Sequence, residues 1–585
     1  MLPLAAVHGA SGGGEKVALI ALALISALAL IVRPAGGAPA RLRAGALIVA
    51  LLGSPALLAA DVWSSSPLVH LRAHPALLAG GIALGLLLLA GIAFAFARAA
   101  SALPLAAISM LPFRVPVTIG GTTANLLLPL YVVIAAGVLS IEVPRLLARG
   151  AGRGRPERGA GRGRAAPLQG GDGPAAAPRQ APQPPGEHPA GRALRVLLAA
   201  FVLLYAIQAA YSIDFSKALQ NVVFFYVPFS LLLCLLLEVR WTPTLLKRAL
   251  AVAVGLGVLF AAAGFVEYGT RSLLFNKALV ASNVYGNYFR VNSLFYDPNI
   301  YGRYLALVMV LLATVAMFAA SRRLLVLCTV CLAWLWLGLI ISISETSIVA
   351  LLAGLAVIGA VRWGVRRAAL GTLAIAAVGL ILFFAAPASL HFGVNGKGGS
   401  LNTATSGRAS LIGGGLHLFE DRPLAGFGSG SFAAQYTRHQ KAGVASSSTD
   451  SHTTPVTIAA EQGIVGLLAY AALLLCCLLV LFGPLRGASG LLAIDGRAPP
   501  AFQNGGASPA LTTARIAIAT AFVALFVHTL AYADFLEDPI TWTLIALGIS
   551  LAAAHRRSAP AAAASLGTPP LRTLAAGEQQ RSAAG

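Results

Sequence analysis

This sequence has few charged residues. They account for 11% of its 585 residues, against about 25% in soluble globular proteins, whereas hydrophobic residues account for 58%. Apolar runs of 16 to 22 residues recur from one end of the chain to the other, and about 20 residues cross the hydrocarbon core of a bilayer as a helix. The composition therefore predicts a membrane protein and excludes a soluble enzyme, a secreted disulfide scaffold and a DNA-binding protein.

Metal-binding motifs are also lacking. The chain has no HExxH motif, no Cys/His cluster and no Asp-x-Asp pair, so we expect neither a transition-metal site nor the usual divalent-ion clamp for a nucleotide-sugar. All five cysteines lie in apolar runs, where they are expected to pack against neighbours. Acidic residues are few in the middle of these runs, which argues against an ion-coupled transporter. We expect no cofactor.

The apolar runs predict an all-α, polytopic integral membrane protein with about 14 transmembrane helices (roughly 13–15) and a large extracytoplasmic loop. Residues 101–119 are a weak candidate, because they contain Pro104, Pro112 and Arg114, and they could equally be a re-entrant or interfacial piece. The orientation of the N-terminus depends on this segment. Residues 17–32 are interpreted as a retained helix, because no small-residue cleavage site follows them.

The net charge of +22 is concentrated in loops. Residues 145–195 hold ten arginines and three acidic residues in a low-complexity stretch that predicts a disordered linker. Cationic segments beside spans stay in the cytoplasm, so this linker fixes the orientation, and contact with anionic lipid is a second interpretation. The predicted parts are N-terminal transmembrane helices at 1–144, the cytoplasmic linker at 145–195, a transmembrane core at 196–389 with an outer loop at 267–301, an extracytoplasmic catalytic loop at 390–463, C-terminal transmembrane helices at 464–555 and a disordered cytoplasmic tail at 556–585.

The two outer loops are long and basic. Long loops in compact folds are usually functional, and lysines and arginines are disfavoured outside by the orientation rule. Two interpretations remain open. Long loops cross the membrane regardless of charge, or these arginines form an anion site, since a guanidinium group binds phosphate oxygens in pairs. The basic residues are Arg271, Lys277, Arg290, Lys397, Arg408, Arg422, Arg438 and Lys441.

The first outer loop leads straight into a span. Asp297 or Asn299 can cap this helix, with Pro298 in its first turn. A helix N-terminus flanked by Arg290 and Arg303 would bind a phosphate group well. The alternative is an ordinary capped start of a helix.

The second outer loop contains an apolar stretch and a glycine run. Residues 411–419 suggest a short helix lying in the membrane interface. The glycines of residues 426–430 are not followed by Gly-Lys-Ser/Thr, so they predict a tight turn and not a phosphate loop. The polar residues 342–347, at the outer end of another span, are either a simple boundary or a wall of a site.

A histidine precedes the next span. Thr454 and Pro455 are a good start signal for a helix, which places His452 at its mouth and Glu461 about two turns further along. An imidazole with an ordinary pKa near 6.5 suits a general base. A lone histidine in a loop is, however, more often without a catalytic role.

Three stretches carry a resemblance to a known family. They are Arg290 through Asp297-Pro-Asn299, Arg408 through Asp421-Arg-Pro-Leu-Ala-Gly-Phe-Gly-Ser-Gly430, and His452 through Glu461-Gln-Gly463. Together they resemble the O-antigen ligase and Wzy-type polymerase family, membrane glycosyltransferases that act on polyprenyl-diphosphate-linked glycans. The similarity covers roughly residues 200–550. Thr453 departs from the pattern, because an asparagine usually follows the histidine.

The resemblance implies a metal-independent, inverting glycosyl transfer on the outer face of the cell membrane. The donor would be a polyprenyl-diphosphate-linked glycan and the acceptor a glycan or a lipid, with membrane lipids around both. Polymerase and ligase differ only in the acceptor, and both remain open. The implied site residues are His452 and Glu461 for catalysis, Arg290, Arg408 and Arg303 for the diphosphate, and Asp297 and Asn299 as structural support.

Two other classes of function remain as alternatives. A polysaccharide exporter or flippase-type transporter would need a cationic central cavity and no catalytic histidine. A structural membrane scaffold would tolerate the loss of both Arg290 and His452.

Overall fold

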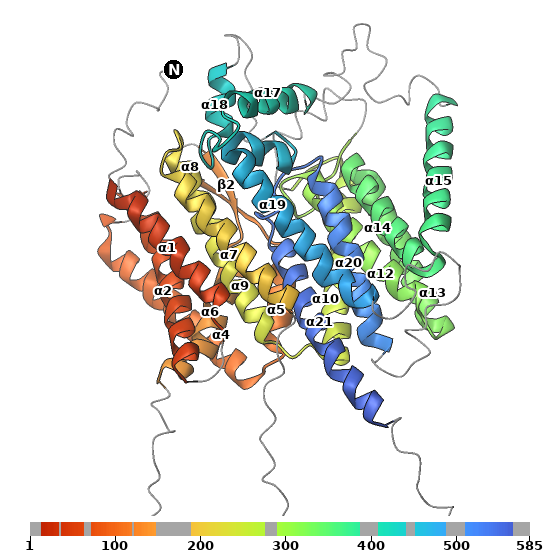
Figure 1. Cartoon of the computed structure of the whole chain (residues 1–585), viewed down its shortest axis with the longest axis horizontal. Coiled ribbons are helices and arrows are strands. Elements are labelled where there is room, and N and C mark those ends of the chain that lie inside the picture. Colours follow the sequence, from red (N-terminus) through yellow and green to blue (C-terminus); the bar gives the residue numbers. More distant parts are fainter. Residues whose placement is uncertain are drawn as a thin grey trace, which may run out of the picture.

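The structure is a computed structural model, and it describes residues 13–33, 37–61, 63, 69, 72–119, 122–147, 189–274, 289–385, 408–439, 451–486 and 509–565. Most of the linker predicted at 145–195, much of both outer loops and most of the predicted tail lie outside these residues. The described part is a bundle of long helices with one small β-hairpin (Figure 1).

Twelve helices of the described part are long and apolar enough to cross a membrane. Their length follows from sustained apolar composition, because a helix satisfies its own backbone hydrogen bonds in hydrocarbon. The prediction of an all-α, multi-pass membrane protein is confirmed. The helices are α1 (Gly13–Ile31), α2 (Gly37–Asp61), α4 (Pro75–Arg98), α6 (Leu128–Leu147), α7 (Pro189–Ala209), a continuous unit of α8 (Phe215–Asn221), a π-helical turn (Val222–Tyr226) and α9 (Val227–Glu238), α10 (Pro243–Thr270), α12 (Pro298–Met317), α13 (Arg322–Ser342), α14 (Glu345–Trp363), α19 (Thr454–Arg486) and α20 (Pro509–Thr529).

Four further helices lie beside these spans or across their ends. Helix α15 (Val365–Ala385) stands beside α13 and α14, and α21 (Pro539–Ser565) begins with an apolar stretch, Pro539–Ala554. The short helices α17 (Arg408–Asp421) and α18 (Phe432–His439) lie across one end of the bundle, here called the loop end (Figure 1). Helix α17 is the short helix predicted from residues 411–419. The opposite end, where α6 stops and α7 starts, is called the linker end.

Residues 101–119 do not form a spanning helix. They give the nine-residue helix α5 (Ala102–Met110) and then strand β1 (Val115–Ile119), which pairs antiparallel with β2 (Thr122–Leu126). At 1.5 Å per residue, α5 covers about 14 Å, roughly half of a bilayer core. The helical backbone extends to Leu111 and ends there, because Pro112 has no N–H to continue the helical hydrogen bonds and its ring blocks a further turn. The structure therefore disfavours a spanning helix here and leaves the alternative, a re-entrant or interfacial piece, and the hairpin is a small departure from an all-α fold.

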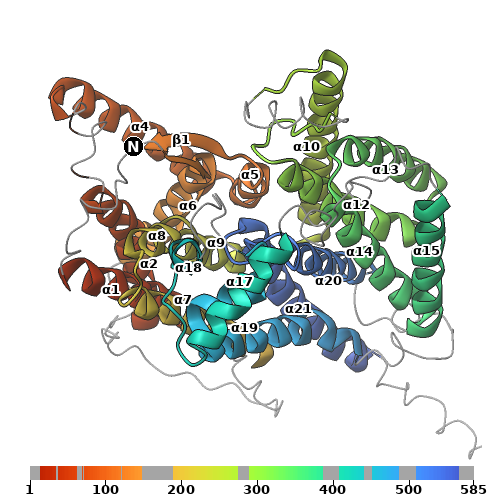
Figure 2. The ribbon, with the colours of Figure 1, turned by 90° about the horizontal axis from the view of Figure 1, so that it is seen from above.

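The C-terminal helices join two groups of earlier helices. Helix α20 packs on α12 and α14, while α19 packs on α7 and α21 packs on α9. Seen from above, α1 to α9 and α10 to α15 lie on opposite sides, with α19, α20 and α21 between them (Figure 2). Segments far apart in the sequence therefore meet at the loop end.

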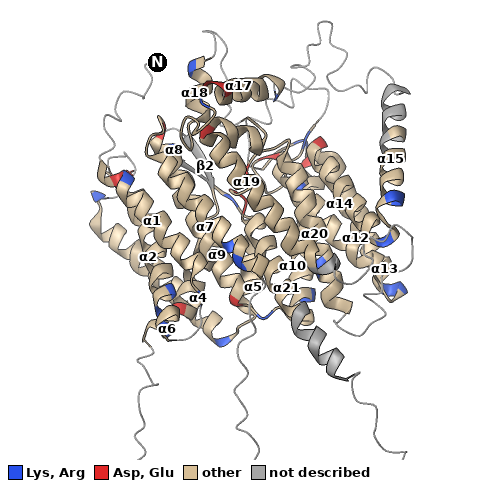
Figure 3. Ribbon diagram, in the orientation of Figure 1, with Lys and Arg blue, Asp and Glu red and all other residues tan. Residues whose placement is uncertain are grey.

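Charged residues lie mainly toward the ends of the helices (Figure 3). At the linker end, Arg43 of α2, Glu142 and Arg145 of α6, and Glu238 of α9 form one cluster. The Arg145 guanidinium lies 3.0 Å from Glu142, and Arg43 pairs with both glutamates. Buried charges are stable only when paired and hydrogen-bonded, so this cluster fixes three helices relative to one another.

Helix α19 is interrupted near its start and supported near its end. Gly463 has φ 65° and ψ −161°, a conformation essentially restricted to glycine, and it divides a short first segment from the long span. Near the other end, Pro484 has no N–H to donate to the Val480 carbonyl four residues earlier. The buried Arg515 of α20 replaces that donor, with Nη2 2.9 Å from Val480 O and Nε 3.3 Å from Leu481 O.

Candidate active site

The first turn of α12 forms one side of the candidate site. Asp297 caps the helix, because its Oδ1 accepts a hydrogen bond from the Asn299 N–H at 2.6 Å, with Pro298 in the first helical position. The second carboxylate oxygen, Oδ2, accepts from the Tyr532 hydroxyl at 3.2 Å. Asp297 therefore ties the start of α12 to the segment between α20 and α21.

A cluster of buried hydroxyls lies behind this turn. Ser344 Oγ donates to Asn299 Oδ1 at 3.0 Å and lies 2.7 Å from Ser347 Oγ. Thr346 and Ser347, at the start of α14, both lie 3.2 Å from Nε2 of His528 on α20. The polar residues 342–347 are thus part of a wall shared by α12, α14 and α20. This outcome favours the site-wall interpretation over a simple helix boundary.

Tyr532 connects the predicted base to this wall. The His452 ring is 6.4 Å from the Tyr532 ring between centroids, and the His528 ring is 5.6 Å from it. The Arg303 guanidinium carbon lies 5.8 Å from the same ring. Loss of hydration, followed by the nearby Asp297 carboxylate, raises the pKa of Tyr532 well above its ordinary value. The hydroxyl is therefore a neutral donor at physiological pH.

The backbone of His452 has an unusual conformation. Its φ is 60°, in the left-handed region that residues other than glycine seldom adopt. The residues on each side are buried, and Ser451 is anchored by Thr457, whose Oγ1 accepts from the Ser451 N–H at 3.1 Å. Thr454 Oγ1 donates to the Thr529 carbonyl at the end of α20. These contacts hold the half-buried imidazole at the mouth of α19, as the sequence predicted.

Two of the three predicted cations act on this cluster. Arg303, 1% exposed, forms an ion pair with Asp538, with Nη2 2.8 Å from Oδ2, while its Nη1 has no hydrogen-bond partner among the residues that the structure describes. Arg408 begins α17 at the loop end and lies close enough to His528 for its charge to act on that imidazole, as does Arg303. The two guanidinium groups, 105 residues apart in the chain, therefore share one neighbourhood.

Arg290 lies at the edge of the same wall. Its Nε donates to the carbonyl of Ser342, the last residue of α13, at 3.3 Å. Ser342 is two residues from Ser344, which contacts Asn299. Arg290 is thus linked to the cluster through the α13–α14 turn.

Glu461 holds the glycine-rich turn. Its carboxylate accepts hydrogen bonds from the N–H groups of Gly430 at 2.8 Å and Phe432 at 3.0 Å. Gly426 has φ 66°, and a Cβ there would lie 2.3 Å from the Glu461 carbonyl oxygen. The tight turn predicted at 426–430 is confirmed. The observed contacts of Glu461 position this turn and α18, and thereby the loop end.

Several residues at the site were not predicted. His528 lies near the end of an apolar span, and Tyr532 and Asp538 lie in the short segment between two spans. A histidine at a span end and an Asp-Pro pair before a helix are signals that could have been used. Their partners, however, come from α12, α14 and the residues before α19, and no local pattern reports such contacts.

The arrangement combines groups suited to a group transfer in which an anionic leaving group departs. A half-buried imidazole, two buried or half-buried guanidinium groups and a neutral phenol surround the capped start of α12.

Residues 330–471 match the O-antigen ligase family. The match runs from within α13 to within α19, so it contains Arg408, His452 and Glu461 and does not reach Arg290, Arg303 or Tyr532. It confirms the resemblance predicted from the sequence and supports an O-antigen ligase-type membrane enzyme of polysaccharide biosynthesis. A search of curated proteins found no match.

Proposed function

We propose that this protein is a membrane glycosyltransferase that moves a glycan from a polyprenyl-diphosphate carrier to a glycan or lipid acceptor on the outer face of the cell membrane. The observation that carries the proposal is the position of Tyr532, whose ring lies near both His452 and Arg303 while its hydroxyl binds Asp297. A candidate base and a candidate cation for the leaving group thereby meet from separate parts of the chain.

The reaction is an inverting substitution at the anomeric carbon. The oxygen of an acceptor hydroxyl attacks this carbon, and its bond to the diphosphate oxygen breaks with the electron pair leaving on the diphosphate. The proton of the attacking hydroxyl goes to a ring nitrogen of His452, because an imidazole can act as a general base. The step is metal-independent, because the proton and the developing charge each have a protein partner.

Fixed cations stabilise the departing diphosphate. Charge-assisted hydrogen bonds from guanidinium groups are most effective where water is excluded. Arg303 is buried and presents an unpaired Nη1, and Arg408 is half-buried nearby. Arg290 would contact the outer part of the diphosphate or the first sugar from the α13–α14 edge.

The remaining predicted residues keep this geometry in place. Asp297 and Asn299 join α12 to Tyr532 and to the α14 serines. Glu461 fixes the turn beside α18. The basic pairs at 247–248, 322–323 and 366–367 lie near helix ends on the side of the linker end, which supports an outward-facing loop end, because positively charged loops stay in the cytoplasm.

The decisive experiment compares His452→Ala with His417→Ala in cells that lack the native protein. His417 is the matched control, because it lies on α17 in the same outer region with its side chain 75% exposed. We expect His452→Ala to lose transfer and to accumulate unjoined lipid-linked glycan, and His417→Ala to behave as the native protein. Normal glycan export and assembly in His452→Ala would contradict the proposal and favour a transporter.

The acceptor is read from glycan chain lengths in the same cells. Loss of long chains in the absence of the protein indicates polymerisation. Long chains that remain on their lipid carrier indicate ligation to another acceptor.

A further inference from the structure

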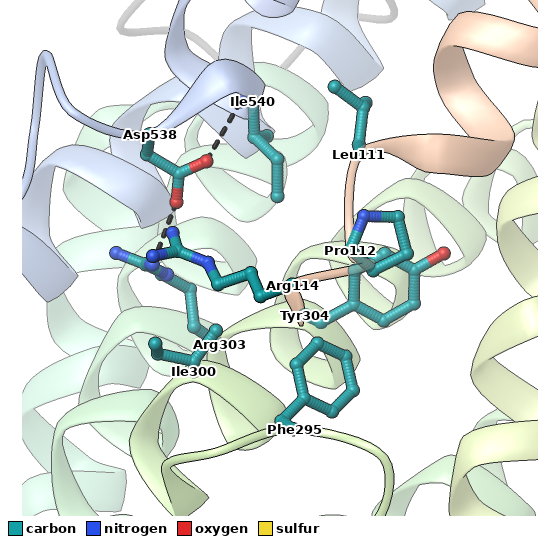
Figure 4. A pocket seen from close by; sticks show the side chains of 9 residues that line it. All are labelled: Leu111, Pro112, Arg114, Phe295, Ile300, Arg303, Tyr304, Asp538 and Ile540. Carbon is teal, nitrogen blue, oxygen red and sulfur yellow. Dashed lines mark hydrogen bonds and ion pairs between the residues drawn. The ribbon is translucent and has the colours of Figure 1, made fainter. Parts of the chain in front are cut away.

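A pocket at the loop end is built partly from the N-terminal half of the chain. Its walls come from the residues between α5 and β1, from the start of α12 and the residues before it, and from the start of α21 (Figure 4). None of its lining residues lies within the region that matches the O-antigen ligase family. The lining residues are Leu111, Pro112, Arg114, Phe295, Ile300, Arg303, Tyr304, Asp538 and Ile540.

Two guanidinium groups face this pocket. Arg303 is paired with Asp538 and has an unpartnered, buried Nη1. Arg114 is half-buried, and in the described part of the chain it forms no hydrogen bond or ion pair. Figure 4 shows its side chain extending toward Arg303 and Asp538. Two positive charges and one negative charge leave a net charge of +1, which favours an anion.

The rest of the pocket is apolar. Leu111 and Pro112 lie on one side, Phe295 and Ile300 on another, and Ile540 closes it from α21. A hydrated inorganic anion would gain nothing from such walls, whereas a hydrocarbon chain is stabilised by burial against them. The lining therefore has the chemical character suited to a ligand that joins an anionic group to an apolar chain. The space between the side chains now holds only about one water molecule, so such a ligand binds by moving them apart.

The backbone around Arg114 has the form expected beside a ligand. Residues 112–114 lie between a short helix and a strand and are not helical. In membrane proteins, non-helical backbone is tolerated where it is buried in protein or lines a cavity. The interruption of residues 101–119 places Arg114 at this pocket, where a continuous helix would have left it facing lipid or a neighbouring helix.

We infer that Arg114 binds the phosphate end of the polyprenyl carrier together with Arg303, and that the first isoprene units lie against Leu111, Phe295 and Ile540. This inference rests on the proposed function and adds to it a binding residue from the N-terminal half. It also places the junction between the diphosphate and the polyprenyl chain at this pocket. Arg114 acts in binding, and His452 remains the group that takes the proton.

The test measures binding to the purified full-length protein in detergent micelles. The probes are geranylgeranyl diphosphate, geranylgeraniol, which lacks the phosphates, and inorganic pyrophosphate, which lacks the chain. We expect the diphosphate lipid to bind more tightly than either part alone. Arg114→Gln should weaken its binding by about tenfold to a hundredfold, the effect of one charge-assisted hydrogen bond, and should leave geranylgeraniol binding unchanged.

Matched variants separate this result from misfolding and from failure of the proposed function. Arg98→Gln, which removes an exposed arginine at the end of α4, should bind like the native protein, and Arg114→Lys should recover part of the affinity. His452→Ala should bind the diphosphate lipid normally even though transfer is lost, so binding tests the pocket independently of catalysis. Native affinity in Arg114→Gln, or pyrophosphate binding as tight as that of the lipid, would overturn the inference.

Discussion

The contacts of Glu461 predict that its substitution lowers stability before it affects chemistry. The carboxylate, 7% exposed, accepts hydrogen bonds from two backbone N–H groups, those of Gly430 and Phe432. In Glu461→Gln, the amide oxygen can accept only one of these bonds, and the amide NH2 then faces the other N–H. The turn at 426–432 would lose its anchor on α19.

The magnitude follows from these two hydrogen bonds. Replacing a bond to a charged acceptor costs about 1.5–3 kcal/mol, and leaving a buried N–H without an acceptor costs about 1–3 kcal/mol more. We therefore expect Glu461→Gln to lower the free energy of unfolding by about 3 kcal/mol or more. Glu420→Gln, which changes an exposed carboxylate on α17, should stay within about 0.5 kcal/mol of the native protein.

The assay is thermal unfolding of the purified protein in detergent, followed by transfer activity in cells. We expect the midpoint of Glu461→Gln to fall by several degrees, with activity recovering at low temperature where the turn remains folded. An unchanged midpoint together with lost transfer would refute this reasoning. That result would mean that Glu461 acts chiefly by orienting His452.

Three further predictions follow from the site and its supports. Asp538→Asn should destabilise the protein by about 3–5 kcal/mol, because it leaves the buried Arg303 charge without its partner, and thermal unfolding measures this. Gly463→Ala should cost about 1–3 kcal/mol, because its backbone conformation suits only glycine and a Cβ would lie 2.4 Å from the Leu424 carbonyl oxygen; the fraction of folded protein after heating measures it. Tyr532→Phe should reduce transfer while leaving the pH profile unchanged below pH about 10, because the raised pKa keeps the native hydroxyl neutral throughout that range; a new basic limb in the native profile that disappears in the variant would contradict this.

The fold was largely predictable from the sequence because hydrocarbon imposes one dominant constraint. Long apolar runs such as residues 298–317 are expected to form helices, because a helix satisfies all the backbone hydrogen bonds of a single segment inside the hydrocarbon core. Residues 101–119 show the limit of this reasoning. Their hydropathy permits a span, and only the prolines and Arg114 signalled the interruption that the structure contains.

The residues of the candidate site could be predicted where they belong to a local sequence motif. His452 and Arg408 were found from such motifs, and the capped start of α12 from Asp297 and Pro298. Tyr532 and Asp538 were missed because their roles depend on how α20 and α21 pack against α12, which no local pattern records. Glu461 was predicted as a partner of His452 in catalysis, which stays a prediction, and the hydrogen bonds that it accepts from the Gly430 and Phe432 N–H groups were not predicted.

The left-handed backbone at His452 bears on how this position can change over generations. A φ of 60° costs a histidine on the order of 1 kcal/mol that glycine would avoid and asparagine would largely avoid. Random substitution followed by selection for stability alone would therefore replace the imidazole with one of these residues. A lineage that keeps a histidine here forgoes that gain in robustness. Under the proposed function, the identity of this single residue would therefore mark whether a related chain still performs transfer.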